Sequence, residues 1–297
     1  MRRVQNATRM AALSVVRRVA RQMNFDLVYR DFYSPLPDLR ALPADFFSRA
    51  SSLPGVSWNA EGQLGFFEDL LPHIAEFDSP AAARVRSASF TLPNGSFEGL
   101  DPLVLFAMVR ALRPARVVEV GSGSSTLVTA SAVALNWADG HPCRFESFDP
   151  FPAPYLRESV TGLSKLADLP AQAIPPDTLF SLRQNDILFI DTTHTVKAGS
   201  EVNYLLLEVL PRLAPGVVVH LHDIFLPWEY PRPFLYERAY FWGEQYLVQA
   251  LLGGSQDFDV LLANHWLART HRSMLRAKLH GGERSYDGGS LWLRRAR

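Results

Sequence analysis

Two acids and two histidines follow two apolar stretches near the middle of this 297-residue chain. Asp191 ends the first stretch and His194 comes three residues later, whereas the second stretch runs directly into His222 and Asp223. Carboxylate and imidazole groups placed together can remove a proton from a substrate or hold a metal ion. These residue types therefore indicate acid–base or metal-assisted chemistry where the two stretches end.

Both stretches are typical of buried strands in a parallel sheet. Residues 186–191 and 217–221 are almost continuously apolar, and a helical apolar spacing from Val202 to Leu210 lies between them. Ligands of open α/β sheets bind at the carboxyl ends of the strands. Four ionisable groups that converge there are costly to bury without protons, partners or a metal. A functional site explains the cluster better than the alternative, a hydrogen-bonded set that only holds loops together.

A glycine turn follows an earlier apolar run. The sequence Val-Val-Glu-Val-Gly-Ser-Gly-Ser-Ser-Thr at 117–126 predicts a strand, a tight turn and the start of a helix. Gly121 and Gly123 would let backbone amides approach a ligand closely, because glycine has no Cβ. Thr126 replaces the third glycine of the dinucleotide fingerprint. Together with Glu119, the turn suits a ligand with a cationic amino acid end and a ribose, without a pyrophosphate.

The turn resembles motif I of class I S-adenosylmethionine (SAM) dependent methyltransferases, and the wider chain is similar to bacterial small-molecule O-methyltransferases with an N-terminal cap. The resemblance covers roughly residues 94–295. It implies an α/β fold with a Rossmann-like, seven-stranded, mostly parallel sheet of order 3-2-1-4-5-7-6 and helices on both faces. It also implies that SAM lies across the turn. The expected SAM contacts are Glu119, Gly121, Ser122, Gly123, Ser125, Thr126, Asp149 and Asp191.

Asp149 has a role of its own in this expectation. It ends the predicted strand 144–148 and lies 26 residues beyond Gly123. An acid near this offset, at the end of the second strand of a βαβ unit, accepts hydrogen bonds from ribose hydroxyls. The alternative is a plain turn aspartate before Pro150.

The strand-end cluster resembles that of metal-dependent O-methyltransferases of the catechol, caffeoyl-CoA and macrolide-sugar types. In these families an Asp ends strand 4 and a Lys or His base lies three residues on, which implies His194 as general base beside Asp191. The families place Asp-Asn or Asp-Asp after strand 5, where this chain has His222-Asp223. Asp191, His222 and Asp223 are thus the candidate ligands of a divalent metal, Mg, Mn or another.

His222 departs from the family pattern. Mg²⁺ prefers oxygen ligands, so an imidazole ligand would shift the preference towards Mn, Fe or Zn. The alternative is that no metal binds and that His222 acts as a second base or as a donor to the substrate.

Apolar spacing and turn residues predict the other elements. A helix begins at Asp101-Pro102, with Asp as the N-cap. Further helices are predicted at 63–77, 125–136 and 234–252, and further strands at 116–120, 144–148, near 172–174, at 258–263 and at 290–294.

Three regions are expected along the chain. Residues 1–24 contain six arginines and no acid and predict a basic amphipathic helix, either packed on the domain or in contact with a membrane surface or an acidic partner. Residues 25–100 are rich in proline and aromatic residues and predict a cap of loops and short helices. Residues 101–297 form the expected methyltransferase domain.

Composition narrows the function classes. The hydrophobic fraction of 47% permits a large core, and the net charge of zero gives no support to nucleic-acid binding. The single cysteine, Cys143, suits a reducing compartment and a cytoplasmic location. No apolar run approaches the roughly 20 residues that a membrane span requires. The expected acceptor is a hydroxyl of a small molecule, while its identity and a homo-oligomeric state stay open.

Three competing interpretations remain. A NAD(P)-dependent oxidoreductase has the same fold class, but the missing third glycine and the chemistry after strands 4 and 5 disfavour it. A metal-dependent hydrolase is suggested by His220-Leu221-His222-Asp223, although Ile224 and Phe225 stand where further ligands would follow. The third is a non-catalytic SAM-binding domain.

Overall fold

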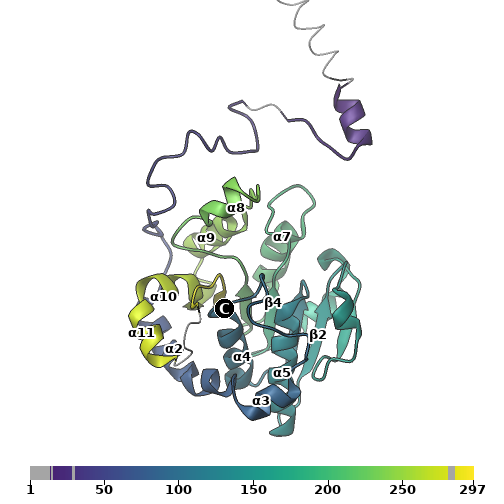
Figure 1. Cartoon of the computed structure of the whole chain (residues 1–297), viewed down its shortest axis with the longest axis vertical. Coiled ribbons are helices and arrows are strands. Elements are labelled where there is room, and N and C mark those ends of the chain that lie inside the picture. The colour runs from purple at the N-terminus through teal and green to yellow at the C-terminus, as the bar shows by residue number, and fades with distance from the viewer. Residues whose placement is uncertain (1–13, 15, 29–30, 280–284) are drawn as a thin grey trace, which may run out of the picture.

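The protein, as a computed structural model, is described at residues 14, 16–28, 31–279 and 285–297 (Figure 1). Its centre is a seven-stranded sheet of order β3-β2-β1-β4-β5-β7-β6, in which β7 runs antiparallel to both neighbours. The sheet order confirms the predicted fold class. The strands are β1 (Arg116–Val120), β2 (Arg144–Phe148), β3 (Lys165–Ala167), β4 (Ile187–Ile190), β5 (Val218–Leu221), β6 (Phe258–Ala263) and β7 (Leu291–Arg295).

The strand order reverses between β1 and β4. From β1 the chain moves outward through β2 to β3, then returns beside β1 at β4 and moves the other way to β5. Right-handed crossovers then place α5 (Ser124–Ala138) on one face and the helical segment that begins with α7 (Glu201–Tyr204) on the opposite face. A crevice between the carboxyl ends of β1 and β4 follows from this reversal, and such crevices bind ligands in doubly wound sheets.

The face that carries α5 is covered by further helices (Figure 1). α4 (Asp101–Leu112) packs against α5, α2 (Ala60–Glu76) packs against α4 and β6, and α3 (Pro80–Val85) packs against α5. Pro72 lies inside α2 without ending it. The region before residue 101 thus contributes helices to the side of the sheet, and its division into separate segments stays a prediction.

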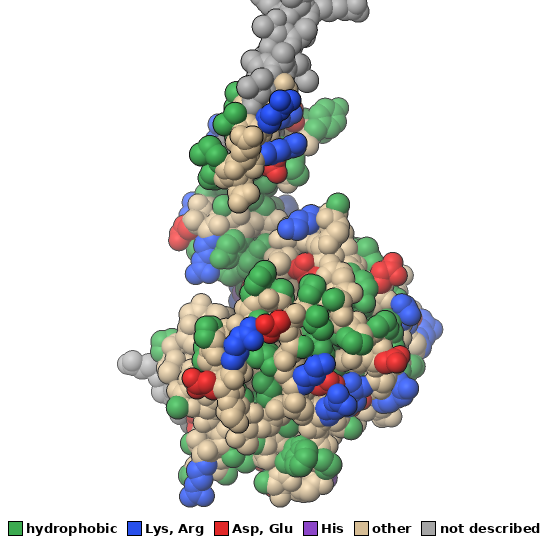
Figure 2. Space-filling view, turned by 90° about the vertical axis from the view of Figure 1, so that its right-hand side faces the viewer, with side chains coloured by type: hydrophobic (Ala, Val, Ile, Leu, Met, Phe, Trp, Pro, Cys, Tyr) green, Lys and Arg blue, Asp and Glu red, His purple; other side chains and the backbone are tan. Residues whose placement is uncertain are grey.

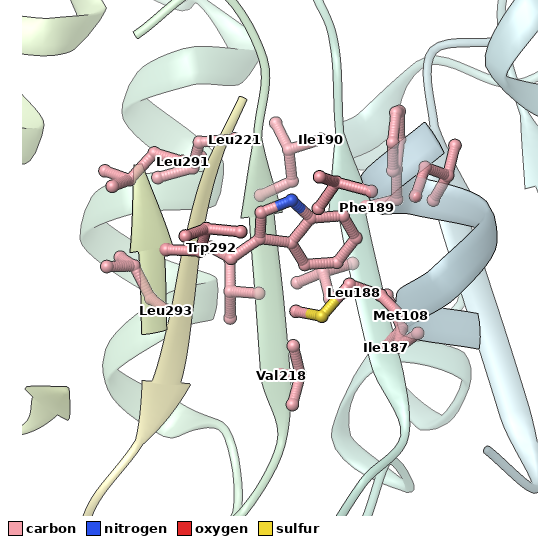
Figure 3. Packing of buried hydrophobic residues seen from close by; sticks show 14 of the residues in the cluster. Met108, Ile187, Leu188, Phe189, Ile190, Val218, Leu221, Leu291, Trp292 and Leu293 are labelled. Carbon is pink, nitrogen blue, oxygen red and sulfur yellow. The ribbon is translucent and has the colours of Figure 1, made fainter. Parts of the chain in front are cut away.

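The core joins this helical layer to the centre of the sheet. Figure 3 shows the indole of Trp292, on β7, lying across the sheet towards Met108 of α4 and Phe189 of β4. Trp292 is fully buried, and Phe189 stacks on His220 with ring centroids 3.9 Å apart. This apolar packing fixes β4, β5 and β7 relative to one another, and therefore fixes the loops that leave β4 and β5.

Two predicted elements were wrong. The third strand is Lys165–Ala167, and the segment predicted near 172–174 is instead a 3₁₀ turn, Ala171–Ala173. Pro170 and Pro175 flank that turn, and proline cannot donate a hydrogen bond to a strand ladder. The single helix predicted at 234–252 is two helices, α8 (Arg232–Tyr236) and α9 (Glu244–Gly254), because the chain leaves the helical region at Ala239, with φ of 54°.

Several smaller elements complete the chain. After β4, α7 continues as a π-helical turn (Leu205–Val209) and a 3₁₀ turn (Leu210–Arg212). The others are a 3₁₀ turn (Pro154–Arg157), α6 (Pro176–Phe180), α10 (Asn264–Thr270) and α11 (Arg272–Lys278).

The N-terminal arm, which comprises the described residues 14 and 16–28, lies away from the sheet and its helices (Figure 1). Residue 14 and residues 16–22 are helical, whereas residues 1–13 and 15 of the predicted basic helix lie outside the described residues. Figure 2 shows hydrophobic and basic side chains exposed along the arm. Within the described part of the chain, no helix combines the length and apolarity that a bilayer crossing requires.

Candidate active site

The glycine turn lies at the β1–β4 crevice, and Gly121 brings the two strand ends together. Its φ of 92° is in the left-handed region, and a Cβ at this position would overlap the carbonyl oxygen of Asp191. The amide of Asp191 donates to the carbonyl of Val120 at 2.9 Å. Gly123 differs, because its backbone is extended and a Cβ there would meet no atom within 4 Å. Gly121 is therefore required by the fold, and Gly123 leaves open space beside the turn.

Glu119 lies beneath the turn. It is fully buried and accepts hydrogen bonds from the hydroxyls of Ser125 at 2.8 Å, Thr126 at 2.7 Å and Ser147 at 2.6 Å. The Thr126 hydroxyl also accepts from the amide of Gly123 at 2.9 Å. The turn is thus held by hydrogen bonds among Glu119, Ser125 and Thr126. No pattern in the sequence indicated that Ser147 would contact Glu119.

The buried Glu119 predicts a specific pH dependence of stability. Burial raises its pKa to about 7, although the three hydroxyls oppose this shift. The folded protein therefore holds this proton more tightly than the unfolded chain, so the stabilisation is complete below the ordinary value of 4.5 and is lost as the pH rises through about 7. The free energy of unfolding, measured by urea denaturation, should fall relative to that of Glu119→Gln between about pH 5 and 8. Parallel curves for the two proteins would contradict this.

Asp149, which follows β2, lines a cavity of about 300 Å³. Oδ2 of Asp149 accepts from the amide of Ser122 at 2.8 Å and from its hydroxyl at 3.1 Å, and Oδ1 accepts from the amide of Phe151 at 2.6 Å. Gly121 and Asp191 also line the cavity. The other lining residues are Val120, Phe148, Pro150, Phe151, Pro170, Ala171, Gln172, Thr192, Thr193 and Glu201. An apolar wall with a few polar groups at its end is typical of small-ligand sites of this size.

His194 lies next to this cavity, among three carboxylates. Its Nε2 is 3.3 Å from Oδ1 of Asp191 and 3.6 Å from Oδ2 of Asp223, and its Nδ1 is 2.7 Å from Oε2 of Glu244. His194 and Asp223 both have a left-handed backbone, with φ of 57° and 55°. Such backbone angles in residues other than glycine concentrate at functional sites. The sequence placed Glu244 on a helix but gave no indication that it reaches the site.

His222 joins the same group from the end of β5. Its Nδ1 is 3.5 Å from Oδ2 of Asp191 and 3.8 Å from Oδ2 of Asp223, and its Nε2 is 3.3 Å from Oδ2 of Asp101. The structure thus brings together all four strand-end residues that the sequence singled out, as predicted.

Asp101 was predicted as an N-cap, but in the structure its side chain contacts His222. It is the first residue of α4, with Leu100 at the N-cap. Its carboxylate accepts from the amides of Gly289 at 2.8 Å and Ser290 at 3.1 Å and from the side chain of Asn264 at 2.8 Å. It therefore anchors His222 to the loop before β7.

The charges of the cluster are coupled. Burial opposes the charged form of His194, but the hydrogen bonds that its ring donates to Asp191 and Glu244 outweigh burial and raise the pKa of His194 to about 10. The pKa of His222 is also raised well above its usual range, chiefly by Asp191 and Asp223 against burial. Burial would raise the pKa of Asp191, but the two neighbouring imidazole rings outweigh burial and hold this pKa far below its ordinary value. The carboxylates therefore favour the charged form of both histidines, with Asp191 between them.

The oxygens of this cluster face imidazoles instead of a common empty point. Among the described residues, no three His, Cys, Asp or Glu side chains are arranged to hold a metal ion. Asp191 directs one oxygen to each histidine. The residues present therefore do not fit a divalent cation in this arrangement.

Comparisons with known proteins agree with the geometry of the turn. Residues 118–224 match a family model described as a methyltransferase domain. An uncharacterised protein of Archaeoglobus fulgidus is 29% identical over 164 residues, which span 52% of this chain and 73% of that protein.

Two solved structures are similar at a greater distance. The apo structure of CmcI is 16% identical, covers 68% of this chain and 72% of its own, and has a TM-score of 0.38. The O-methyltransferase from Bacillus cereus in complex with SAH is 12% identical, covers 80% of this chain and 99% of its own, and has a TM-score of 0.39. Both TM-scores are low, so these two structures add nothing to the match of residues 118–224.

The matched segment begins in β1 and ends just after β5. It contains the glycine turn, the end of β2 and both strand ends that carry the charged cluster. The sheet around it has the order 3-2-1-4-5-7-6 with an antiparallel β7. Over this segment, which carries the glycine turn and the charged cluster, the chain is therefore similar to a methyltransferase domain.

Proposed function

We propose that the protein methylates a hydroxyl of a small molecule, with His194 as the base that takes the hydroxyl proton. The proposal depends on the location of Asp191 between the cavity and the two histidines. This residue lines the cavity beside the glycine turn and also contacts both His194 and His222. The donor cavity and the charged cluster therefore meet at one side chain, as a transfer between them requires.

The residues beside the cavity fit SAM. When bound, SAM supplies a methyl group activated by a sulfonium, so the donor itself needs little help from the protein. The open space beside Gly123 admits a ligand against the backbone of the turn. Asp149, at the end of β2, is the acceptor for ribose hydroxyls. Positioning of the two partners is then the main task of the protein.

The proton of the acceptor is the second task, because a neutral hydroxyl is a poor nucleophile. Nε2 of His194 faces Asp191 and Asp223, on the side of the cluster that adjoins the cavity. His194 must first lose the proton that these carboxylates stabilise. A cationic ligand beside Asp191 competes for the same negative charge and lowers the pKa of His194. Binding of the donor and activation of the base are thereby linked, and His222 keeps Asp191 oriented.

The expectation of a divalent metal receives less support. Asp191, His222 and Asp223 would be its ligands, but the two imidazoliums already neutralise the carboxylates. A metal would have to displace protons from His194 or His222, and ligand deprotonation weakens binding at neutral pH. No step of the mechanism is therefore assigned to a metal.

Calorimetric titration with SAM and NADH, followed by transfer of a labelled methyl group, tests the proposal. Suitable acceptors are catechol, a hydroxycinnamic acid and a methyl glycoside, each assayed with EDTA and with added Mg²⁺ or Mn²⁺. We expect SAM to bind, NADH not to bind, and transfer to at least one hydroxyl to persist in EDTA. Binding of NADH without SAM would favour an oxidoreductase. SAM binding without transfer to any acceptor would favour the non-catalytic interpretation, and rescue by a metal after EDTA would restore the metal-assisted mechanism.

The remaining parts of the proposal concern the surroundings of the enzyme. The buried Cys143 is the single thiol of the chain, which suits a cytoplasmic location. The acceptor is proposed to be a small molecule and not a nucleic acid, because the chain has no net charge.

A further inference from the structure

Glu244 is held in an unusual way for a buried acid. It is 1% exposed, and burial raises the pKa of its carboxyl group. Oε2 makes a 2.7 Å hydrogen bond with Nδ1 of His194, whereas Oε1 is buried without a hydrogen-bond partner among the described residues. Burying a carboxylate with one oxygen unpaired costs free energy. Glu244 is therefore a poor contributor to stability, and its one side-chain hydrogen bond leads to the proposed base.

The backbone beside Glu244 also binds His194. The amides of Gly243 and Glu244 donate to the carbonyl of His194 at 3.0 and 3.2 Å. His194 is thus fixed at its backbone and at its ring by the first residues of α9. The indole of Trp242 lies on the ring of His194, with centroids 4.4 Å apart, and restricts its rotation.

The next residue of α9 fixes the loop after β5. Oε1 of Gln245 accepts from the amide of Phe225 at 3.1 Å, and its Nε2 donates to the carbonyl of Trp228 at 3.3 Å. The amide of Gln245 donates to the hydroxyl of Tyr230 at 3.0 Å. One helical turn, 50 residues beyond His194, therefore joins the loops that leave β4 and β5.

We propose that Glu244 is the positioning residue of His194: it binds Nδ1, fixes the plane of the ring and leaves Nε2 as the nitrogen that faces the acceptor. This inference rests on the proposed function, because it assigns the working atom of that base. The hydrogen bond made by one ring nitrogen determines the role of the other. Removing the hydrogen-bond partner of a metal-bound histidine typically lowers activity about 10- to 100-fold. We expect a similar loss when the partner of His194 is removed.

Three variants of the full chain test the role of Glu244. Glu244→Ala removes the partner of Nδ1, Glu244→Gln keeps an oxygen acceptor without the charge, and Glu244→Asp keeps the charge on a shorter side chain. For an acceptor found active in the transfer assay, we expect Glu244→Ala to lower kcat about 100-fold with KM and the Kd of SAM unchanged. Glu244→Gln should recover most of this loss. The melting temperature of Glu244→Gln should stay near the wild-type value, because this variant keeps an oxygen acceptor for Nδ1 of His194.

A second measurement needs no acceptor and separates this inference from the proposed function. A buried imidazole Nδ1–H that donates to a carboxylate should give a slowly exchanging, far-downfield proton signal, assigned by its absence in His194→Gln. We expect the signal to disappear in Glu244→Ala and to persist in the matched control Glu229→Gln. Glu229 also interacts with α9, through the hydroxyl of Tyr246 at 2.6 Å, but it is on the surface. Persistence of the signal in Glu244→Ala, or loss of SAM binding in parallel with kcat in Glu244→Gln, would overturn the inference.

Discussion

Replacing His194 by Ala or Gln should lower the rate of methyl transfer by about 10²- to 10⁴-fold and should not weaken the binding of SAM. The reason is the separation of the two halves of the site. His194 contacts Asp191, Asp223 and Glu244, and it does not line the cavity beside the glycine turn. Removing it takes away the proton acceptor and leaves the donor side intact. Single-turnover transfer and calorimetric titration with SAM measure the two quantities.

Two controls guard this result against loss of folding. The Ala variant leaves the carboxylates of Asp191 and Glu244 without their shared cation, and removing one partner of a buried pair is strongly destabilising. His194→Gln keeps a hydrogen-bond donor and should retain the wild-type fold. His141→Ala changes a histidine that precedes β2, at the amino ends of the parallel strands and so away from the site, and should leave transfer unchanged. A His194→Gln protein that transfers at the wild-type rate would remove His194 from the mechanism.

The parts of the site that the sequence predicted are those encoded by short stretches of the chain. Gly121 stands at the end of an apolar strand, and His222 follows another strand directly, so topology alone brings them to one edge. The residue types then limit the chemistry. The sheet order came from the resemblance to a family, because strand spacing alone does not determine which strands pair.

The parts that the sequence missed come from distant elements. Glu244 and Asp101 reach the cluster from α9 and α4, and neither position has a local pattern that separates it from an ordinary residue at a helix start. Ser147 lies on a buried strand and reaches Glu119 only because β2 pairs with β1. Such contacts depend on packing across the whole sheet, which periodicity does not encode.

The wrong elements also have local physical causes. Proline at 170 and 175 prevents a strand where the apolar pattern favoured one. The helix predicted at 234–252 has a helical apolar pattern throughout, but the turn between α8 and α9 packs Trp242 and Tyr240 together, with ring centroids 4.6 Å apart. Tertiary packing of these aromatic side chains therefore outweighs the helical preference of the segment.

The second large effect is expected at Gly121. Gly121→Ala should lower the free energy of unfolding by about 2 to 5 kcal/mol, since the left-handed backbone costs an L residue about 1 to 2 kcal/mol and overpacking adds about 1 to 3 kcal/mol. The overlapping atom is the Asp191 carbonyl oxygen, which is backbone and cannot rotate away. The variant must therefore part the ends of β1 and β4, and SAM binding should be lost with the crevice. Urea denaturation and calorimetric titration measure both effects.

Gly123→Ala is the matched control, because it adds the same methyl group two residues away. Its backbone is extended and the added carbon meets no protein atom within 4 Å, so the free energy of unfolding should change by less than about 1 kcal/mol. The methyl group instead enters the space proposed for SAM, and the Kd of SAM should rise at least about tenfold. The two variants therefore distinguish a glycine required for stability from a glycine required for SAM binding. If Gly123→Ala bound SAM as tightly as the wild type, the donor could not lie against this turn, and Asp191 would no longer connect the two halves of the reaction.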